Sequence, residues 1–455
     1  MSRRLKLRLA IIGGIVLLLS AFGLTALAEG QTPRLLETSP ADGAVDVPAA
    51  APLRLVFSAP MDAESVSERM SIEPNRPGTL VWQGNTLVFT PSQPWPSGET
   101  VTVMLRSGAR AQTILSFGLT EQSWSFTAAQ TLLAYLWPAS GPPDLYALDP
   151  LTGDIRRLTT DANILDYSFS PDGLVVYYSA TNVQGGADLY ALDHSSEAGA
   201  QRLLACGQTA CRSPVASPDG RTLAYESVPH ITSSQVVQVW LLDLTAGNAA
   251  ALGDLAHENS QPRWSTTGKL AYYDQTSLAY IIYDPLLQTR LSLPNQTGQG
   301  GSWSPDGRYF VAAEISITPL NATTEVGVSR LLRYDTQTGA AVDLTRADDV
   351  EDVNPVFSPD GSLIAFGRKY LDPARWTLGR PLWIMTADGS AVRQVMIDPL
   401  RVDYDFAWSM EGQQLAFVRF DQGAPTSPPE LWLVNANGTE PLELVVGGYA
   451  PAWVP

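Results

Sequence analysis

Short runs of alternating hydrophobic and polar residues recur along nearly the whole chain. Examples are Leu53–Phe57, Thr86–Thr90 and Ser123–Thr127, and clusters of Gly, Pro, Asp or Ser separate such runs. Alternation with a period of two predicts half-buried strands, and the turn residues mark where the strands end. The 36 Gly and 34 Pro in 455 residues interrupt any long helix. We therefore predict an all-β protein, with a length that requires at least two domains.

The first 30 residues follow a different pattern. Four basic residues between positions 3 and 8 precede an apolar run from Leu9 to Leu27, and Ala26-Leu27-Ala28 offers a small-x-small cleavage site. These features are typical of a secretory signal, but the run is also long enough to span a bilayer. Residues 1–30 are therefore either a signal peptide or an N-terminal membrane anchor. Both alternatives place the remainder outside the cytoplasm, either secreted, periplasmic or anchored.

Residues 33–129 contain short strands separated by turn clusters, a pattern typical of a β-sandwich. The strings TSPADGAVDVP, LRLVFSAPMD, LVFTPSQPWPSGETVTVML and WSFT occur here in this order. They resemble the bacterial Ig-like domain family of surface-layer and envelope proteins. The resemblance covers nearly the whole segment. It implies a spacer or adhesion module without catalytic residues.

The rest of the chain, residues 131–455, is repetitive. The word Ser-Pro-Asp-Gly starts at Ser170, Ser217, Ser304 and Ser358, and degenerate copies start at Ser265 and Ser409. A Trp, Phe or Ala precedes each copy, often with a proline two residues earlier. Residues 450–455, APAWVP, repeat this opening a seventh time. Internal repetition at a period of about 47 residues indicates a propeller or a solenoid.

Each repeat also contains an LAY-like strand, a YALD-like strand and a short final strand. Four strands per repeat are typical of a propeller blade. The segment begins with an LAY-like strand at Leu133 and ends with the Pro-x-Trp strand at Trp453. The last strand can therefore complete the first blade, which removes both open sheet edges. We predict a seven-bladed β-propeller that is closed by its C-terminal strand.

The Ser-Pro-Asp-Gly word suits a type I turn, in which Pro presets φ and the Asp carboxylate accepts local backbone N–H groups. We interpret its aspartates as structural. Together, PxWSPDGxxLAF…LWxxD…LT resembles the WD40-like (PD40) repeat of the TolB-like propeller family. That resemblance implies a non-catalytic binding propeller outside the cytoplasm. Related propellers accompany prolyl-oligopeptidase-type domains, whose G-x-S-x-G elbow we do not find in this sequence.

Long insertions distinguish one predicted face of the propeller from the other. They comprise residues 226–237, 314–328, 368–381 and 418–428, and the third of them contains Tyr370 and Trp376. Elaborated loops often carry function, so we predict a partner-binding face there, with neutral decoration as the alternative.

Loops leading into the inner strands add acidic residues to the same face, among them Asp166, Asp349, Asp352 and Asp405. We hypothesise an acidic mouth that attracts a cation such as calcium, or a basic segment. The alternative is a solvated rim on an acidic protein.

The two cysteines, Cys206 and Cys211, are separated by four residues. In an exported protein this spacing favours a local disulfide over free thiols. A metal site is disfavoured, because His194 and His230 show no ligand spacing relative to the cysteines.

The formal net charge of −17 and the lack of a basic stretch outside the N-terminus exclude a nucleic-acid-binding protein. We find no phosphate loop, metal motif or catalytic triad pattern, and we expect no cofactor. We therefore predict a monomeric, non-catalytic envelope protein whose propeller binds a protein or an envelope or cell-wall ligand, with membrane contact through the N-terminal segment only. The alternative is a cell-wall glycan or peptide hydrolase with its site at the channel mouth, or an accessory subunit of such an enzyme.

Overall fold

The computed structural model describes residues 32–49, 51–112, 118–160, 162–194, 199–230, 235–321 and 324–455. The chain divides into two compact units between Gln130 and Thr131. The predicted signal peptide or anchor lies outside the described residues. Within those residues, no helix combines the length and apolar character needed to cross a membrane.

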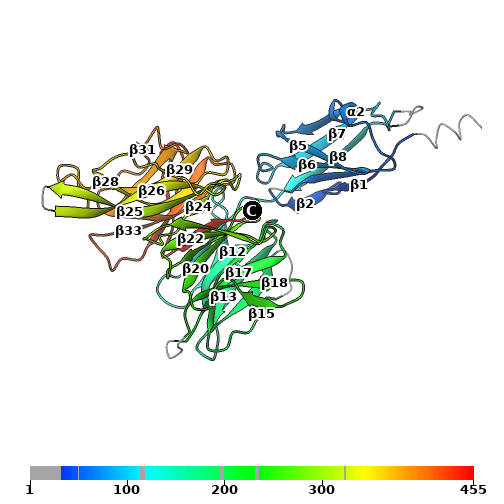
Figure 1. Ribbon diagram of the computed structural model, residues 1–455. Coiled ribbons are helices and arrows are strands. Elements are labelled where there is room, and N and C mark those ends of the chain that lie inside the picture. Colours follow the sequence, from blue (N-terminus) through cyan, green and yellow to red (C-terminus); the bar gives the residue numbers. More distant parts are fainter. Residues whose placement is uncertain are drawn as a thin grey trace, which may run out of the picture. The chain divides into compact units, whose positions relative to one another are not determined.

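The first unit is built from two four-stranded sheets (Figure 1). One contains, in spatial order, β1 (Leu35–Ser39), β3 (Leu53–Phe57), β6 (Thr86–Pro91) and β5 (Gly78–Gln83). The other contains β2 (Ala44–Val47), β8 (Gln122–Ala128), β7 (Thr100–Leu105) and β4 (Met70–Glu73). A short helix, α2 (Ala63–Ser67), begins after Asp62, whose carboxylate accepts the Ser65 N–H.

The inward-facing positions of these strands form the core of the first unit. Trp95 is fully buried and contacts Phe126 edge to face at 5.4 Å between ring centroids. Its indole N–H donates to the carbonyl of Ala51 at 2.8 Å, so the buried polar atom is satisfied. This arrangement confirms the predicted β-sandwich.

The second unit consists of four-stranded groups, which we number as blades 1–7. Blade 1 comprises β9 (Leu133–Trp137), β10 (Asp144–Leu148), β11 (Ile155–Arg157) and β36 (Tyr449–Trp453). Blade 2 comprises β12 (Ile164–Phe169), β13 (Val175–Thr181), β14 (Ala187–Asp193) and β15 (Gln201–Leu204). Blade 3 comprises β16 (Ala210–Ala216), β17 (Thr222–Val228), β18 (Gln238–Asp243) and β19 (Ala249–Ala251). Blade 4 comprises β20 (Asn259–Trp264), β21 (Leu270–Asp274), β22 (Ala279–Asp284) and β23 (Thr289–Pro294).

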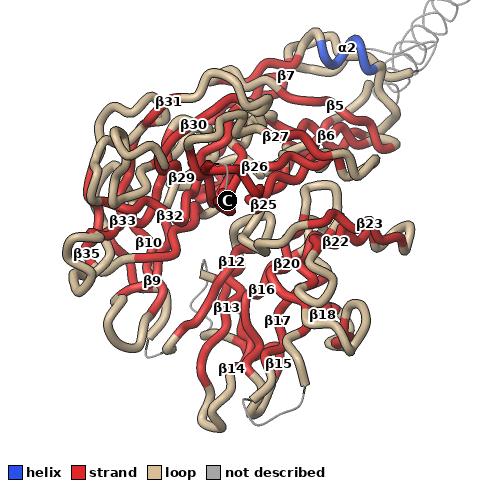
Figure 2. The backbone as a smooth tube through the Cα atoms, turned by 60° about the vertical axis from the view of Figure 1, so that its left-hand side comes forward, coloured by secondary structure: helices blue, strands red, loops and turns tan. Residues whose placement is uncertain are grey.

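The remaining blades follow the same plan. Blade 5 comprises β24 (Ser302–Trp303), β25 (Tyr309–Asn321), β26 (Thr324–Asp335) and β27 (Ala341–Asp343). Blade 6 comprises β28 (Val350–Phe357), β29 (Leu363–Tyr370), β30 (Leu382–Thr386) and β31 (Arg393–Gln394). Blade 7 comprises β32 (Arg401–Trp408), β33 (Gln414–Asp421), β34 (Glu430–Asn435) and β35 (Leu442–Val446). Figure 2 shows that strands make up most of the described chain.

Buried hydrophobic clusters hold neighbouring blades together. Such a cluster joins each consecutive pair of blades, and a further one joins blade 7 to blade 1. The last of these clusters includes Tyr135 of β9 and Leu431 of β34. Strand β36 pairs antiparallel with β9, with Trp453 opposite Leu133. The number of blades and the closure of the ring stay predictions, which the C-terminal variants described below test.

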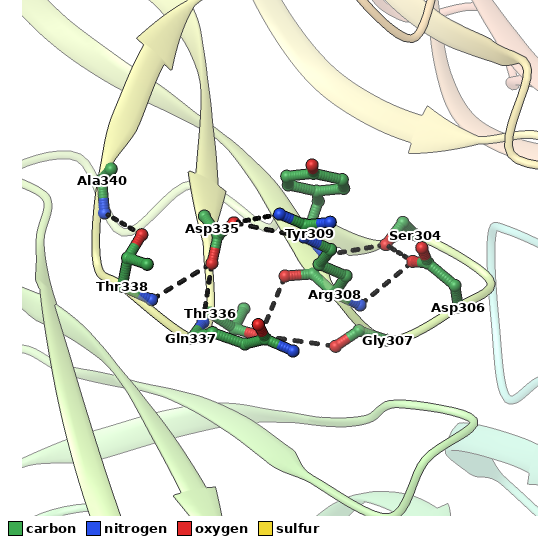
Figure 3. A network of polar contacts seen from close by, with 10 residues as sticks. All are labelled: Ser304, Asp306, Gly307, Arg308, Tyr309, Asp335, Thr336, Gln337, Thr338 and Ala340. Atoms are coloured by element: carbon green, nitrogen blue, oxygen red, sulfur yellow. Dashed lines mark hydrogen bonds and ion pairs between the residues drawn. The ribbon is translucent and has the colours of Figure 1, made fainter.

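The Ser-Pro-Asp-Gly words form tight, hydrogen-bonded turns between the first two strands of a blade. In blade 5, Ser304 Oγ donates to Asp306 Oδ1 at 2.5 Å and accepts the Tyr309 N–H at 2.8 Å (Figure 3). Beside this turn, Asp335 accepts the backbone N–H groups of the next turn, and the Arg308 guanidinium bridges the two turns at 3.2 Å. The same serine–aspartate bonds recur at the other three copies of the word. These aspartates therefore hold turns together and do not form a shared site.

Candidate functional site

Most of the innermost strands carry a bulge at the same position of the repeat. The pairing register shifts in β12, β16, β20, β28, β32 and β36. At five of these bulges the residues Ser213, Gln261, Asn354, Asp405 and Ala450 have φ values from 50° to 58°. A bulge redirects a side chain away from the ladder, and bulges are frequent beside functional sites. The repeat thus places a redirected side chain at the same position of several inner strands.

Four of these bulge residues, Ser213, Gln261, Asp405 and Ala450, line one cavity of about 420 Å³. Its wall is formed by the inner strands β12, β16, β20, β32 and β36, and β12 contributes Asp166, which directly follows the bulge of that strand. Apolar contacts come from Phe406 and from several prolines, and further charges come from Glu226 and Arg263. Ligand pockets are concave sites on which a few polar groups converge, and this cavity has those features with a lining that is more polar than is usual.

Two of the carboxylates in this cavity are held by neighbouring protein groups. Asp166 Oδ2 accepts a hydrogen bond from Arg212 Nε at 3.0 Å, which is also an ion pair. Glu226 Oε1 accepts the backbone N–H of Gln261 at 2.7 Å. Both carboxylates are therefore part of the wall that shapes the cavity.

Arg263 and Asp405 differ from these two carboxylates. Among the described residues, none forms a hydrogen bond or ion pair with the side chain of either one. The surrounding channel walls raise the pKa of the Asp405 carboxyl, and the charge of Arg263 partly lowers it. Burial raises the pKa of Tyr167, and the nearby charge of Asp405 raises it further. The Tyr167 hydroxyl donates to the Ala450 carbonyl at 2.6 Å.

The structure thus separates the acidic residues that the sequence had grouped. Asp166 and Asp405 lie together in the cavity. Asp349 instead forms an ion pair with Arg375 in the blade 6 insertion. Sequence reasoning placed all of these side chains at one mouth, because it could not show which way each one points.

Asp352 is a correction to the predicted acidic mouth. Its side chain is 0% exposed and lies in a bidentate ion pair with Arg368, at 2.7 Å for both hydrogen bonds. Thr345 Oγ1 donates to the same carboxylate at 2.9 Å. This aspartate is therefore unavailable to calcium or to a basic segment, and it fixes blade 6 to the end of blade 5.

Tyr370 and Trp376 lie in the blade 6 insertion and do not line the cavity. Tyr370 pairs with Val350 at the start of β28, so this insertion lies at the sheet end where the chain enters the inner strands. Trp376 is 52% exposed, with Lys369 Nζ 4.5 Å from its ring centroid. Arg375 lies over the Tyr370 ring at 4.3 Å. These four residues form what we call the blade 6 surface.

Cys206 and Cys211 are joined in a disulfide between β15 and β16. Cys206 N–H donates to Asp188 Oδ1 at 2.9 Å, and Arg212, the partner of Asp166, directly follows the second cysteine. The disulfide thereby constrains the start of an inner strand. Within the described part of the chain, no three His, Cys, Asp or Glu side chains gather as a metal site.

The sequence reasoning missed Ser213, Gln261, Arg263 and Glu226 as cavity residues. A signal was present, because Pro214 and Pro262 recur at one position of the repeat and a polar residue directly precedes each. A position before proline that must also adopt a positive φ favours a bulge, but the sequence does not show the φ value.

His257, in the loop that leads into β20, provides a test of local electrostatics. Its Nδ1 lies 2.8 Å from Asp274 Oδ2, and this hydrogen bond, together with the carboxylate charge, raises the pKa of the imidazole above 6.5. The pair therefore favours the folded state below pH 6.5, and this contribution is lost as the pH rises through the raised pKa. We expect an NMR titration of His257 to have its midpoint above 6.5 and to return toward 6.5 in Asp274→Asn. The same midpoint in both proteins would contradict the pairing.

Comparison with known proteins addresses the class of the first domain. Residues 29–128 match the model of the bacterial Ig-like domain family. The match agrees with the resemblance seen in the sequence. Together with the sheet arrangement, it confirms an all-β chain with an Ig-like domain ahead of a propeller.

Particular relatives resemble larger parts of the chain. The uncharacterized peptidase YuxL of Bacillus subtilis (strain 168) is 24% identical over 213 residues, which are 46% of this chain and 30% of that protein. The match therefore spans less than a third of that relative. A putative TolB from Agrobacterium tumefaciens has a TM-score of 0.40 at 19% identity, covering 71% of this chain and 92% of its own. TolB from Acinetobacter baumannii has a TM-score of 0.45 at 13% identity, covering 85% and 83%.

Proposed function

We propose that this chain is a non-catalytic, exported envelope protein whose propeller binds a ligand or protein and whose Ig-like domain acts as a spacer. The observation that carries the proposal is the cavity, which five inner strands line and to which four of them contribute a bulge residue. Glu226, in its wall, is also the first residue of the 226–237 insertion, so the cavity adjoins an elaborated loop. The match of residues 29–128 to the bacterial Ig-like domain family supports a location in the envelope.

The blade 6 surface is the proposed contact for a protein partner. Exposed aromatic residues beside cationic side chains are typical of interface anchors. We expect Tyr370→Ala and Trp376→Ala to weaken retention of a partner from the exported fraction by about tenfold or more, because anchors of this kind contribute 2 kcal/mol or more. The measurement is a pull-down with the full chain as bait, quantified by mass spectrometry.

Leu286→Ala is the matched control for these two variants. Leu286 is exposed and apolar, but it lies in the turn after β22, at the opposite end of the blades. Equal retention by the control and by both aromatic variants would remove the blade 6 surface from the proposal.

A hydrolase is the second candidate, because Asp166, Glu226 and Asp405 converge on one cavity. A raised pKa, as at Asp405, suits a general acid. A panel of cell-wall glycans and peptides would test this candidate. Turnover that is abolished by Asp405→Asn would establish it, and no turnover by the unmodified chain would exclude it.

A further inference from the structure

We propose that the propeller cavity binds a small zwitterionic ligand, with Arg263 holding its carboxylate and Asp405 holding its ammonium group. The inference rests on the proposed binding function and specifies the ligand class of that site. Free amino acids and short peptides with unblocked termini have this chemistry.

The two charges come from different blades that line the cavity. Arg263 belongs to β20 of blade 4 and Asp405 to β32 of blade 7, and these blades are not neighbours. The two side chains form no ion pair with each other, although the charge of Arg263 lowers the pKa of Asp405. The cavity of about 420 Å³ lies between the strands that carry them. A ligand with opposite charges at its two ends matches this arrangement.

The local backbone supports both positions. Asp405 occupies a bulge with a φ of 51°, which directs its side chain into the cavity, and aspartate tolerates this conformation better than most residues. The Arg263 guanidinium lies over Gly300, where an added Cβ would be 3.0 Å from Nη2. Glycine at this position leaves room for a planar guanidinium, which can bind a carboxylate in a bidentate manner.

The rest of the wall favours a zwitterion over a simple cation. Asp166 is paired with Arg212, and Glu226 Oε1 accepts the backbone N–H of Gln261 and so is held in place without a cation. Arg263 and Asp405 are the charged side chains of the lining that no such contact from the described residues holds. Ser168 Oγ and Gln261 Oε1 have no hydrogen-bond partner among the described residues. Both oxygen atoms are buried, so they belong to the packing of the wall and are not counted as ligand contacts. The volume is within the range of small-molecule sites.

Calorimetry on the full chain tests the proposal with defined probes. Alanine, alanyl-alanine and trialanine are the zwitterions, and N-acetyl-alanyl-alanine and alanyl-alanine amide each lack one charge. Putrescine, succinate and calcium are the simple ions. We expect at least one zwitterion to bind, and each single-charge analogue of alanyl-alanine to bind about tenfold or more weakly than alanyl-alanine itself, because a charge-assisted hydrogen bond is lost.

Two variants assign the ends of the ligand. Arg263→Gln should weaken alanyl-alanine about tenfold or more and leave the amide unchanged, since the amide makes no carboxylate contact. Asp405→Asn should weaken alanyl-alanine and leave the N-acetyl form unchanged. Exposed residues outside the cavity provide the controls, Arg54→Gln and Glu411→Gln, which remove the same charges and should change nothing.

The remaining outcomes of these experiments would contradict either the ligand class or the binding function. Equal binding of blocked and free peptides, tighter binding of putrescine or calcium, or no binding of any zwitterion would overturn the proposed ligand class. If no zwitterion binds but Arg263→Gln or Asp405→Asn loses a partner in the pull-down, the binding function stands and the ligand class falls. If neither assay responds to any variant, both proposals fall.

Discussion

Replacing Arg368 with methionine is expected to lower the free energy of unfolding of the propeller by about 3–5 kcal/mol. The change leaves the Asp352 carboxylate without its cation, and that carboxylate is wholly shielded from solvent. Burial already raises the pKa of Asp352, and the Arg368 charge and its hydrogen bonds counteract this effect. Removing the cation leaves the cost of burial uncompensated.

The arginine also contributes packing. Its guanidinium carbon lies 5.1 Å from the Phe366 ring centroid and 5.4 Å from that of Trp383. Methionine keeps much of this apolar contact, so the variant isolates the charge. The same pattern recurs in blade 7, where Arg419 pairs with buried Asp403 and lies over Phe417 and Trp432. Arg419→Met should therefore have a similar effect.

Urea unfolding of the full chain, followed by tryptophan fluorescence, measures the change. Arg375→Met is the matched control, because Arg375 is half exposed and its pairs with Asp349 and Asp372 contribute about 1 kcal/mol at most. Replacing both buried partners, as in Asp352→Leu with Arg368→Met, should recover most of the lost stability. Equal effects of Arg368→Met and Arg375→Met would contradict this account.

The sequence predicted the features that depend on local pattern. The Ser-Pro-Asp-Gly words predicted the turns at Ser170, Ser217, Ser304 and Ser358, because the side-chain and backbone bonds of such a turn lie within five residues. Three of the repeated tryptophans connect blades through a hydrogen bond, whereas the indole N–H of Trp264 has no partner among the described residues. Trp303, Trp408 and Trp453 each donate to a carbonyl of the preceding blade, at 2.9, 3.1 and 3.0 Å.

The candidate site depends on features that pattern does not determine. Asp352 and Asp405 both occupy inner strands of adjacent repeats, but one side chain points between blades and the other into the cavity. When the two repeats are aligned on the serine that follows each inner strand, Asp352 lies two residues before the position of Asp405. Side chains two residues apart normally point to the same face of a strand, but the bulge at this point reverses that alternation. The two adjacent cations in the otherwise apolar strand β29, Arg368 and Lys369, were the available sign that Asp352 is paired.

Trp453→Ala is expected to lower the free energy of unfolding by about 3–5 kcal/mol, the usual cost of truncating a large buried aromatic side chain. The side chain is 7% exposed, packs with Tyr135 and Leu433 between blades 1 and 7, and donates its N–H to Ala407. Trp376→Ala is the control, because that ring is 52% exposed and should contribute about 0.5 kcal/mol or less.

Deletion of residues 449–455 extends the same test to the closure of the ring. Without β36, the backbone groups of β9 that pair with Tyr449 and Ala452 face solvent, and the hydrophobic clusters on both sides of blade 1 lose their contribution from this strand. An open apolar edge strand promotes association between chains. We therefore expect light scattering to show oligomers of the shortened chain and a monomer for the full chain. If the deletion changes neither the free energy of unfolding nor the monomeric state, β36 does not close the propeller. Loss of a strand that joins the two ends of a ring would alter the stability or the oligomeric state.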